Sequence, residues 1–571
     1  MSSVSISAAP APRKARVRLP WLLVLLLAAV LVFQGQGEMV RVITPPSAAW
    51  SRPLTLASAP ANGSFTQVAL ADGRLVIIWA THQGFHLFNV APDGTVTGPV
   101  ALFSSEVSPA GVKAVLSGDA VYMFWEDFST HTLRAAAVAP DGTVKAAPRD
   151  MVTGVKDYAV AAGGSPSAPY VLAMTADQVA LYGLSQTGDW TAAALPLTLR
   201  GGLGVDLQSA RDGTLYGLAA SEEDRVGEAP VHILLLQPDT QGRLLEGGQP
   251  RLVAHEVATS GLQPLKEGLS HLSLGLDSHN AYVFWDVQRN DRGERSTLSS
   301  YVTWPVERPP AQSLKPVGLS ALPNFGRPIS GLSGVVPAPG QAGQLVTAAP
   351  ATLGSGRDRV VETLELTFQD GKLVSQQLAG PSTSMTLQPL MTRSGQDRWL
   401  AWVQPRGNSA SLLVGGTAEL FRKAMGRVRL SDWMDAVGNT VVNIGYAYVP
   451  ALISLAWVFP TMMLIAAAYL LALNWAERNG LVLNVVGIVF YLALKVFMAN
   501  SLLLTPPVVA RMPVFMAAHV SWVAVGSLVA ASLELLRKNR RFLQAPVAAS
   551  LAPLILYDMA LMALIVAPYI K

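Results

Sequence analysis

Apolar residues form long runs near the ends of the chain and short alternating runs in its middle. Towards the C-terminus, four mostly apolar stretches are each 24 residues or longer. A helix of about 20 apolar residues, rising about 1.5 Å per residue, crosses a hydrocarbon core of about 30 Å. We therefore expect residues 446–571 to form a four-helix transmembrane domain, with helices at 446–473, 481–504, 513–536 and 546–570.

A shorter apolar run, Leu19 to Phe33, follows four basic residues near the N-terminus. This run rises only about 22 Å as a helix, so the core of a signal peptide competes with a membrane anchor. The nearby small-x-small site at 35–37 matches the Ala-x-Ala cleavage pattern poorly. The sequence thus favours an uncleaved transmembrane anchor at 19–34, a basic cytoplasmic tail at 1–18 and a linker at 35–51.

The distribution of lysine and arginine orients the predicted helices. Cytoplasmic segments of membrane proteins are enriched in these residues, and two dense clusters fall at 13–18 and 537–541. Five spans place both clusters on one side. This predicts a multi-pass protein of the cell membrane, with a cytoplasmic N-terminus and residues 35–445 outside. Four further basic residues within 422–429 fall on the outer side, where we expect them to face lipid headgroups from an amphipathic connector at 418–445.

Residues 52–417 have a different character, because short β-rich runs alternate with turns rich in Gly, Asp, Asn and Pro. The run VAPDGTVTGPV, starting at Val90, recurs as VAPDGTVKAAP at Val138. A second repeated unit is a turn followed by an apolar strand that contains a tryptophan. Its four examples carry Trp79, Trp125, Trp285 and Trp402.

These units divide the middle of the chain into seven four-stranded repeats. Their first turns fall near Asp72, Gly118, Gly164, Asp212, Asp277, Gly340 and Gly395. The spacing is close to the 40–50 residues of a propeller blade. The region resembles β-propeller repeat proteins at fold level, with no narrower family indicated. An all-β extracytoplasmic domain of seven blades is therefore expected, and a pair of antiparallel sandwiches is the alternative.

The seventh repeat supplies only three strands before the chain leaves for the membrane, so its outer strand must come from elsewhere. Residues 52–57 precede the first blade and are suited to this place. Such closure removes exposed sheet edges. It also predicts that both membrane connections leave from the same face of the propeller.

Composition excludes several classes of function. Only 14% of the residues are charged, and the net charge is +4 without a basic stripe, so nucleic acid is not an expected partner. The chain has no cysteine, which excludes disulfides and thiolate chemistry. It also has no HExxH run, Walker-type loop or GxSxG elbow. We expect no enzymatic activity, no cofactor and no metal site.

Polar residues after the second strands of the blades are the candidate ligand-binding groups. They are Glu126, Asp127, Asp286, Arg289, His82 and His131. Further polar residues in the predicted hairpins are Asn290 to Arg292 and Glu222 to Arg225. Carboxylates around a propeller funnel could bind a cation, a basic peptide or a sugar, and two of them could serve a glycosidase. Ordinary solvation of loop residues is the alternative interpretation.

Ionisable residues inside the predicted bundle are Lys495, Asp558 and His519. A charge at the centre of a membrane helix costs roughly 2.5–3.5 kcal/mol, so these residues need an explanation. Lys495 and Asp558 lie about 21 Å and about 17 Å from the cytoplasmic end, close enough in depth to pair. A structural ion pair is favoured, and a polar pathway or proton relay is the alternative.

Together these features predict a membrane-anchored extracytoplasmic propeller that acts as a binding or scaffolding module of a bacterial-type cell envelope. Its expected partners are the lipid bilayer and an envelope protein, peptide or glycan at the outer propeller face. Two alternatives remain. One is an envelope hydrolase with carboxylates in the funnel, and the other is a small transporter or transport-accessory subunit.

Overall fold

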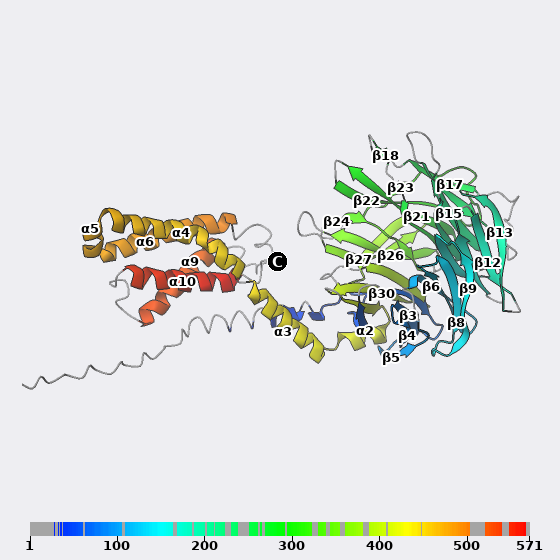
Figure 1. Ribbon diagram of the computed structural model, residues 1–571, viewed down its shortest axis with the longest axis horizontal. Helices are drawn as coiled ribbons and strands as arrows, with labels where there is room; N and C mark the ends of the chain where they lie inside the picture. Colours follow the sequence, from blue (N-terminus) through cyan, green and yellow to red (C-terminus); the bar gives the residue numbers. More distant parts are fainter. Residues whose placement is uncertain are drawn as a thin grey trace, which may run out of the picture. The chain divides into compact units, whose positions relative to one another are not determined.

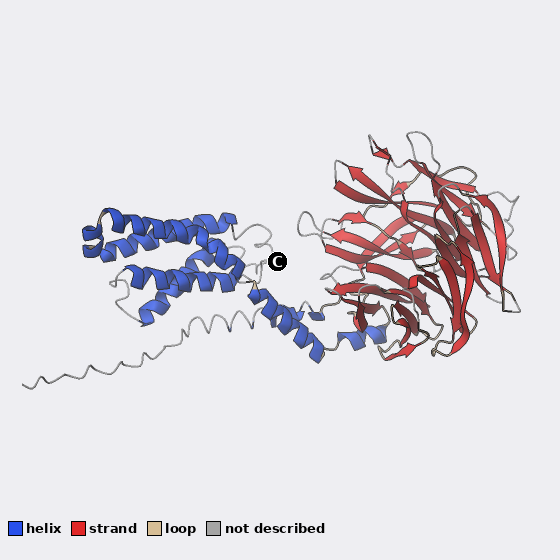
Figure 2. Ribbon diagram, in the orientation of Figure 1, coloured by secondary structure: helices blue, strands red, loops and turns tan. Residues whose placement is uncertain are grey.

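In the computed structural model, the strand-rich middle of the chain and its helical end are separate units (Figures 1 and 2). The strand-rich unit is Pro45–Arg427, and the helical unit combines Met1–Thr44 with Val428–Lys571. The structure describes seven positions between 28 and 40, and then residues 42–566 apart from some segments. Those segments are 61–62, 105–108, 164–167, 177, 186–187, 200–201, 211, 223–229, 238–250, 258, 261–262, 265–268, 292–293, 323–328, 339–342, 354–359, 381–386, 407–408, 447, 503–519 and 539–546.

The strand-rich unit is a seven-bladed β-propeller, as the repeats predicted. Blade 1 is β2 (Ser64–Ala69), β3 (Leu75–Thr81), β4 (Gly84–Val90) and β5 (Val96–Ala101). Blade 2 is β6 (Pro109–Ser117), β7 (Ala120–Asp127), β8 (Thr132–Val138) and β9 (Val144–Thr153). Blade 3 is β10 (Asp157–Gly163), β11 (Ala168–Met174), β12 (Gln178–Leu184) and β13 (Trp190–Thr198). Blade 4 is β14 (Gly202–Ser209), β15 (Leu215–Glu222), β16 (Pro230–Leu236) and β17 (Arg251–Val257).

The later blades depart further from the regular pattern. Blade 5 is β20 (Leu269–Leu276), β21 (Asn280–Asp291), β22 (Glu294–Pro305) and β23 (Val317–Gly318), preceded by the small hairpin β18 (Thr259–Ser260) and β19 (Gln263–Pro264). Blade 6 has a divided inner strand, β24 (Ile329–Leu332) and β25 (Val336–Pro337), followed by β26 (Gln344–Leu353), β27 (Val360–Gln369) and β28 (Lys372–Leu378). Blade 7 is β29 (Leu387–Ser394), β30 (Asp397–Arg406), β31 (Ser409–Gly416) and β1 (Leu54–Pro60).

The ring closes through β1, as predicted. This strand pairs antiparallel with β31, from Leu54 opposite Val414 to Pro60 opposite Ser409. It starts two residues later than the predicted 52–57 and runs to Pro60. The incoming and outgoing chains are therefore adjacent, and Ser51 N donates to Gly416 O at 3.0 Å. The inner strands contact one another in circular order, including β29 with β2.

The repeated Asp-Gly-Thr turns have a local physical cause. In each turn the aspartate carboxylate accepts the backbone N–H two residues later, at 2.9 Å for Asp93, 2.8 Å for Asp141 and 2.9 Å for Asp212. The glycine between them has a positive φ, 85° at Gly94 and 94° at Gly142. Glycine adopts this conformation without the strain that a Cβ imposes. The first turns predicted near Gly164 and Gly340 lie outside the described residues.

The recurring tryptophans are core residues of the blades. Trp79, Trp125, Trp285 and Trp402 are all buried. Each is the fifth or sixth residue of the second strand of its blade. Their recurrence marks a packing position between neighbouring sheets.

The helical unit contains the predicted C-terminal helices. They are α4 (Tyr448–Leu471), α6 (Gly480–Leu502), α9 (Val520–Lys538) and α10 (Val547–Val566). Two further helices are α3 (Leu430–Gly445), which precedes α4, and α5 (Leu473–Arg478), which lies between α4 and α6. A common core contains Trp457 of α4, Tyr491 of α6, Leu528 of α9 and Leu554 of α10. Within the described residues, two helices, over Val449–Leu471 and Gly480–Met498, are long and apolar enough to cross a membrane. Most of the predicted anchor at 19–34 lies outside the described residues.

The connector predicted at 418–445 is divided between the two units. Its first helix, α2 (Glu419–Gly426), belongs to the propeller, where Phe421 packs edge-on against Trp399 at 4.8 Å between ring centroids. Arg422 Nη1 donates to Ala48 O at 2.8 Å, and Lys423 pairs with Glu419 at 2.6 Å. These two cations, which the sequence suggested would face lipid headgroups, have partners within the propeller unit.

Candidate functional site

The hairpin between β7 and β8, which we call the blade-2 hairpin (residues 126–132), carries three of the predicted ligand-binding residues. Asp127 is buried, and its Oδ1 accepts Ser129 N at 3.1 Å and Ser129 Oγ at 2.7 Å. Burial raises the pKa of Asp127, but the Ser129 hydrogen bonds and the nearby Arg134 charge outweigh it, so that the pKa lies below its usual value. Asp127 therefore acts first on its own hairpin, which it holds in one conformation.

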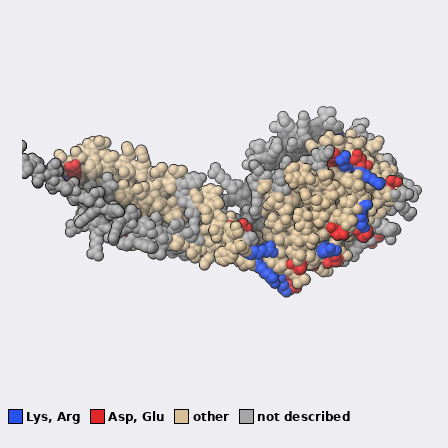
Figure 3. Space-filling view, turned by 60° about the horizontal axis from the view of Figure 1, so that its bottom comes forward, with Lys and Arg blue, Asp and Glu red and all other residues tan. Residues whose placement is uncertain are grey.

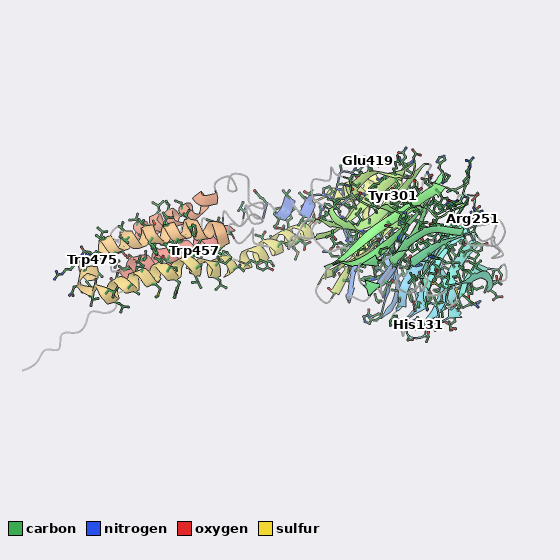
Figure 4. The ribbon with its side chains drawn as sticks, turned by 90° about the horizontal axis from the view of Figure 1, so that it is seen from above. His131, Arg251, Tyr301, Glu419, Trp457 and Trp475 are labelled. Atoms are coloured by element: carbon green, nitrogen blue, oxygen red, sulfur yellow. The ribbon has the colours of Figure 1, made fainter. Side chains whose placement is uncertain are left out.

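Glu126 and His131 form a second contact across the same hairpin. His131 Nδ1 lies 2.6 Å from Glu126 Oε1, and His131 has a positive φ of 50°. Figure 4 shows His131 at the periphery of the propeller. Between these residues Phe128 is 67% exposed, with its ring centroid 6.0 Å from that of His131. Phe128 is not among the predicted residues, although it is the apolar residue of an otherwise polar hairpin.

Asp286 is buried. Ser299 Oγ lies 2.5 Å from its Oδ1, and Gly334 N donates to its Oδ2 at 2.6 Å. Gly334 belongs to the segment between β24 and β25, so Asp286 ties blade 5 to blade 6. Its role in binding stays a prediction, and the contacts give it a structural role already.

The remaining predicted ligand-binding residues lie on separate blades. His82 is exposed in the turn between β3 and β4 of blade 1. Arg289 lies within β21 of blade 5, because that strand continues to Asp291 and the hairpin is longer than predicted. The Arg289 side chain lies outside the described part of the structure, as do residues 223–225. The structure thus brings Glu126, Asp127 and His131 together in one hairpin.

A second set of polar residues, which sequence analysis missed, joins the inner strands of successive blades. Asp157 Oδ2 on β10 accepts Val205 N of β14 at 2.9 Å. Asp206 Oδ2 on β14 accepts Leu274 N of β20 at 2.6 Å. In each case a carboxylate of one blade binds a backbone N–H of the next. The available signal was a single charge within an otherwise apolar inner strand.

Asp206 has a strongly perturbed carboxyl group. Burial raises its pKa to about 6, although the Lys113 charge and the hydrogen bonds from Leu274 N and Leu207 N act in the opposite direction. The Asp206 carboxyl therefore stays protonated to a higher pH in the folded protein than in an unfolded chain.

The helical unit contains a buried cluster of four polar residues, Tyr491 and Lys495 of α6, Ser527 of α9 and Asp558 of α10, which we call the helix-core cluster. Lys495 Nζ donates to Asp558 Oδ1 at 2.6 Å and to Oδ2 at 2.8 Å, which confirms the predicted pairing. Tyr491 Oη donates to Asp558 Oδ2 at 2.5 Å. Ser527 Oγ lies 2.7 Å from Asp558 Oδ1 and 2.6 Å from Lys495 Nζ.

This cluster links three helices through one carboxylate. Tyr491, Lys495 and Asp558 are fully buried, and the charges of the last two neutralise each other. A second polar contact lies on the same stripe of α6, where Ser550 Oγ donates to Asn484 Oδ1 at 2.8 Å. The arrangement can lock the helix packing, and it could also exchange a proton. His519, predicted as part of this polar set, lies outside the described residues.

Comparison with known proteins gives similarity in fold only. No protein-family model matches the chain, and no curated protein matches it. A polysaccharide lyase, Uly1, has a TM-score of 0.39 at 9% identity, covering 62% of this chain and 90% of its own. The SapL1 lectin, solved in complex with alpha methyl fucoside, has a TM-score of 0.32 at 12% identity, covering 56% and 97%. An alpha-L-arabinanase from Cellvibrio cellulosa has a TM-score of 0.26 at 11% identity, covering 45% and 99%.

These similarities are too low to indicate a shared activity. The class of the protein follows instead from its own sheets: a seven-bladed β-propeller joined to a helical unit. In the described part of that unit, two helices are long and apolar enough to cross a membrane.

Proposed function

We propose that this chain is a membrane-anchored binding protein of the cell envelope, whose propeller lies outside the membrane and engages a partner through the blade-2 hairpin. The observation that carries the proposal is the exposed ring of Phe128 on a hairpin held by Asp127 and by the Glu126–His131 contact. A large apolar side chain on a rigid support is the usual anchor of a binding surface, because little conformational entropy is lost on binding.

The membrane anchoring is supported by the exterior of the helical unit. Among the large apolar side chains described there, Leu470, Leu471 and Phe497 are 77% to 86% exposed. On the face shown in Figure 3, the described surface of this unit is almost free of charged side chains, while charges are scattered over the propeller. Lipid favours such an exterior and water does not.

The tip between α4 and α6 fits one membrane boundary. Trp475 of α5 is half exposed, and Glu477 and Arg478 follow it in the same short helix. Tryptophan and charged residues are enriched at such boundaries. With the anchor at 19–34, the helices α4, α6, α9 and α10 would make five spans, which places this tip and the 537–541 cluster on the cytoplasmic side.

Binding is favoured over hydrolysis because of the way the carboxylates are used. Asp127 and Asp286 are buried and accept hydrogen bonds from their own surroundings, and Glu126 is paired with His131. A glycosidase needs two carboxylates facing one bond at a set separation. Hydrolysis of chromogenic glycosides by the whole protein, abolished by Glu126→Gln, would support the hydrolase instead.

The partner is expected to be an envelope protein, peptide or glycan with an apolar surface that receives Phe128. The test compares the whole protein with Phe128→Ala and with Val374→Ala, a matched control at an exposed apolar residue of blade 6. The three are purified from native membranes in mild detergent after chemical cross-linking. Loss of the same cross-linked partner from Phe128→Ala alone supports the proposal, and an unchanged set of partners in all three contradicts it.

A further inference from the structure

One helix of the helical unit, α3, exposes an apolar face. This α3 apolar face consists of Leu430, Trp433, Met434, Val437 and Val441. Their exposed fractions run from 55% at Trp433 to 77% at Leu430. At 100° per residue these five positions fall within about 100° of one another, so they form one continuous stripe.

The other sides of α3 are different. Asp432, Ala436 and Thr440 recur every four residues and are buried, so one side of the helix is packed. Asp435 and Asn439 are exposed on a third, polar side. Since the helix already has a packed side and a solvated side, its exposed apolar stripe is a separate surface that water would solvate poorly.

The chain continues directly from α3 into a helix that could cross a membrane. α3 ends at Gly445 and α4 begins at Tyr448, and the apolar stretch of α4 starts at Val449. Two or three residues reach at most about 10 Å, so the end of α3 lies wherever α4 enters the bilayer. The stripe also contains a tryptophan, which is enriched at membrane interfaces.

Two arginines precede the α3 apolar face in the sequence. Arg427 is exposed, and Arg429 comes immediately before the first residue of α3. An amphipathic helix that combines an apolar stripe with nearby arginines is typical of helices that lie in the plane of an interface containing anionic lipid.

We infer that α3 lies in the membrane interface, with its apolar face inserted among acyl chains and Arg427 and Arg429 at anionic headgroups. This inference rests on the proposed membrane insertion of α4. A helix fixed in the interface restricts the directions in which the connecting chain can leave the membrane. This restriction would be the role of α3.

The test uses single cysteines in the whole chain, which contains none of its own. Val437→Cys probes the α3 apolar face, Asn439→Cys is the matched control on the polar side, and Leu455→Cys probes the exposed surface of α4. Each is labelled with an environment-sensitive fluorophore and reconstituted in vesicles of phosphatidylcholine with phosphatidylglycerol. Nitroxides are placed on lipids at shallow or deep positions.

The expected result is quenching and a blue shift at position 437 with shallow nitroxides, quenching at 455 with deep ones, and neither at 439. Quenching at 437 should decrease when phosphatidylglycerol is omitted or when Arg427→Gln is added. Quenching at 455 without quenching at 437 overturns the inference and leaves membrane anchoring intact. No quenching at either position overturns the anchoring as well. A blue shift at 437 without lipid quenching, together with cysteine cross-linking between chains, identifies a second copy as the occupant and overturns the inference.

Discussion

The propeller and the helical unit differ most in the kinds of side chain that they expose. Between the propeller blades lie large apolar residues such as Trp285, Phe284 and Phe368, and charges lie on the exterior (Figure 3). The helical unit buries Lys495 and Asp558 in its interior and exposes large apolar side chains on its outside. The same chain therefore follows two folding rules, one suited to water and the other to lipid.

The difference also extends to how each unit fixes its geometry. In the propeller, backbone ladders close each sheet, and single carboxylates such as Asp157 and Asp206 join one blade to the next. In the helical unit, one carboxylate receives donors from α6 and α9 at once. In water, the burial of apolar side chains separates the interior of a fold from its exterior. In lipid the surroundings are also apolar, so contacts between polar groups help to hold the helices together.

The largest expected effect is on the propeller, where replacing Leu54–Pro60 with a Gly/Ser linker of equal length removes the fourth strand of blade 7. That strand supplies Leu54 and Leu56 to the core and pairs along β31. We expect the whole propeller to lose cooperative unfolding, because a typical net stability is only about 5–15 kcal/mol. Limited proteolysis and thermal unfolding measure this. Replacing residues 1–11 is the control, and equal protease resistance of both variants would contradict ring closure through β1.

The next effect concerns the helix-core cluster. Lys495→Met or Asp558→Leu leaves an uncompensated buried charge and should cost about 3–5 kcal/mol, while the double substitution should cost less. Thermal stability of the single and double variants in detergent completes the cycle. Additive losses would show that the two charges are not coupled, and ion flux that depends on either residue would favour the transporter alternative.

A smaller effect is expected from Asp206 in the propeller. Burial raises its pKa from the ordinary value of 3.8 to about 6. Between about pH 4 and pH 6 the folded protein holds this proton and the unfolded chain releases it, so the stability contributed by this group falls as the pH rises. The change is at most about 3 kcal/mol, since one pKa unit corresponds to about 1.4 kcal/mol.

Thermal unfolding of the propeller between pH 4 and pH 7 tests this dependence. Asp206→Asn should flatten it, and Asp150→Asn, at an exposed carboxylate, is the control. A slope that is unchanged in Asp206→Asn would remove this residue as its source.

Local chemistry explains which parts of the fold could be predicted. The Asp-Gly-Thr turns are closed by contacts two residues apart, and the tryptophans recur at one strand position, so both signals are visible in a single sequence. The pairing of Lys495 with Asp558 could be predicted because depth along a membrane helix is simple arithmetic.

The parts that could not be predicted depend on contacts between distant segments. The burial of Asp286 follows from Gly334 in the next blade, and the divided inner strand of blade 6 has no local signal. The two-unit division of the connector depends on Phe421 reaching Trp399. Phe128 was not predicted, because a single sequence does not show that an apolar residue in a hairpin is exposed.

The smallest expected effect compares one residue type in the two units. Phe459 of α4 is 67% exposed, whereas Phe368 of β27 is fully buried. In detergent, Phe459→Ala should change the stability of the helical unit by less than about 0.5 kcal/mol, because its ring faces the surrounding apolar phase in both folded and partly unfolded helices. Phe368→Ala should cost the propeller about 3–5 kcal/mol through lost burial and the cavity left behind. Separate thermal transitions of the two units measure both changes in one whole-chain preparation. A large loss at Phe459 would mean that this face is covered by protein instead of lipid, and the two units would then follow the same rule of burial.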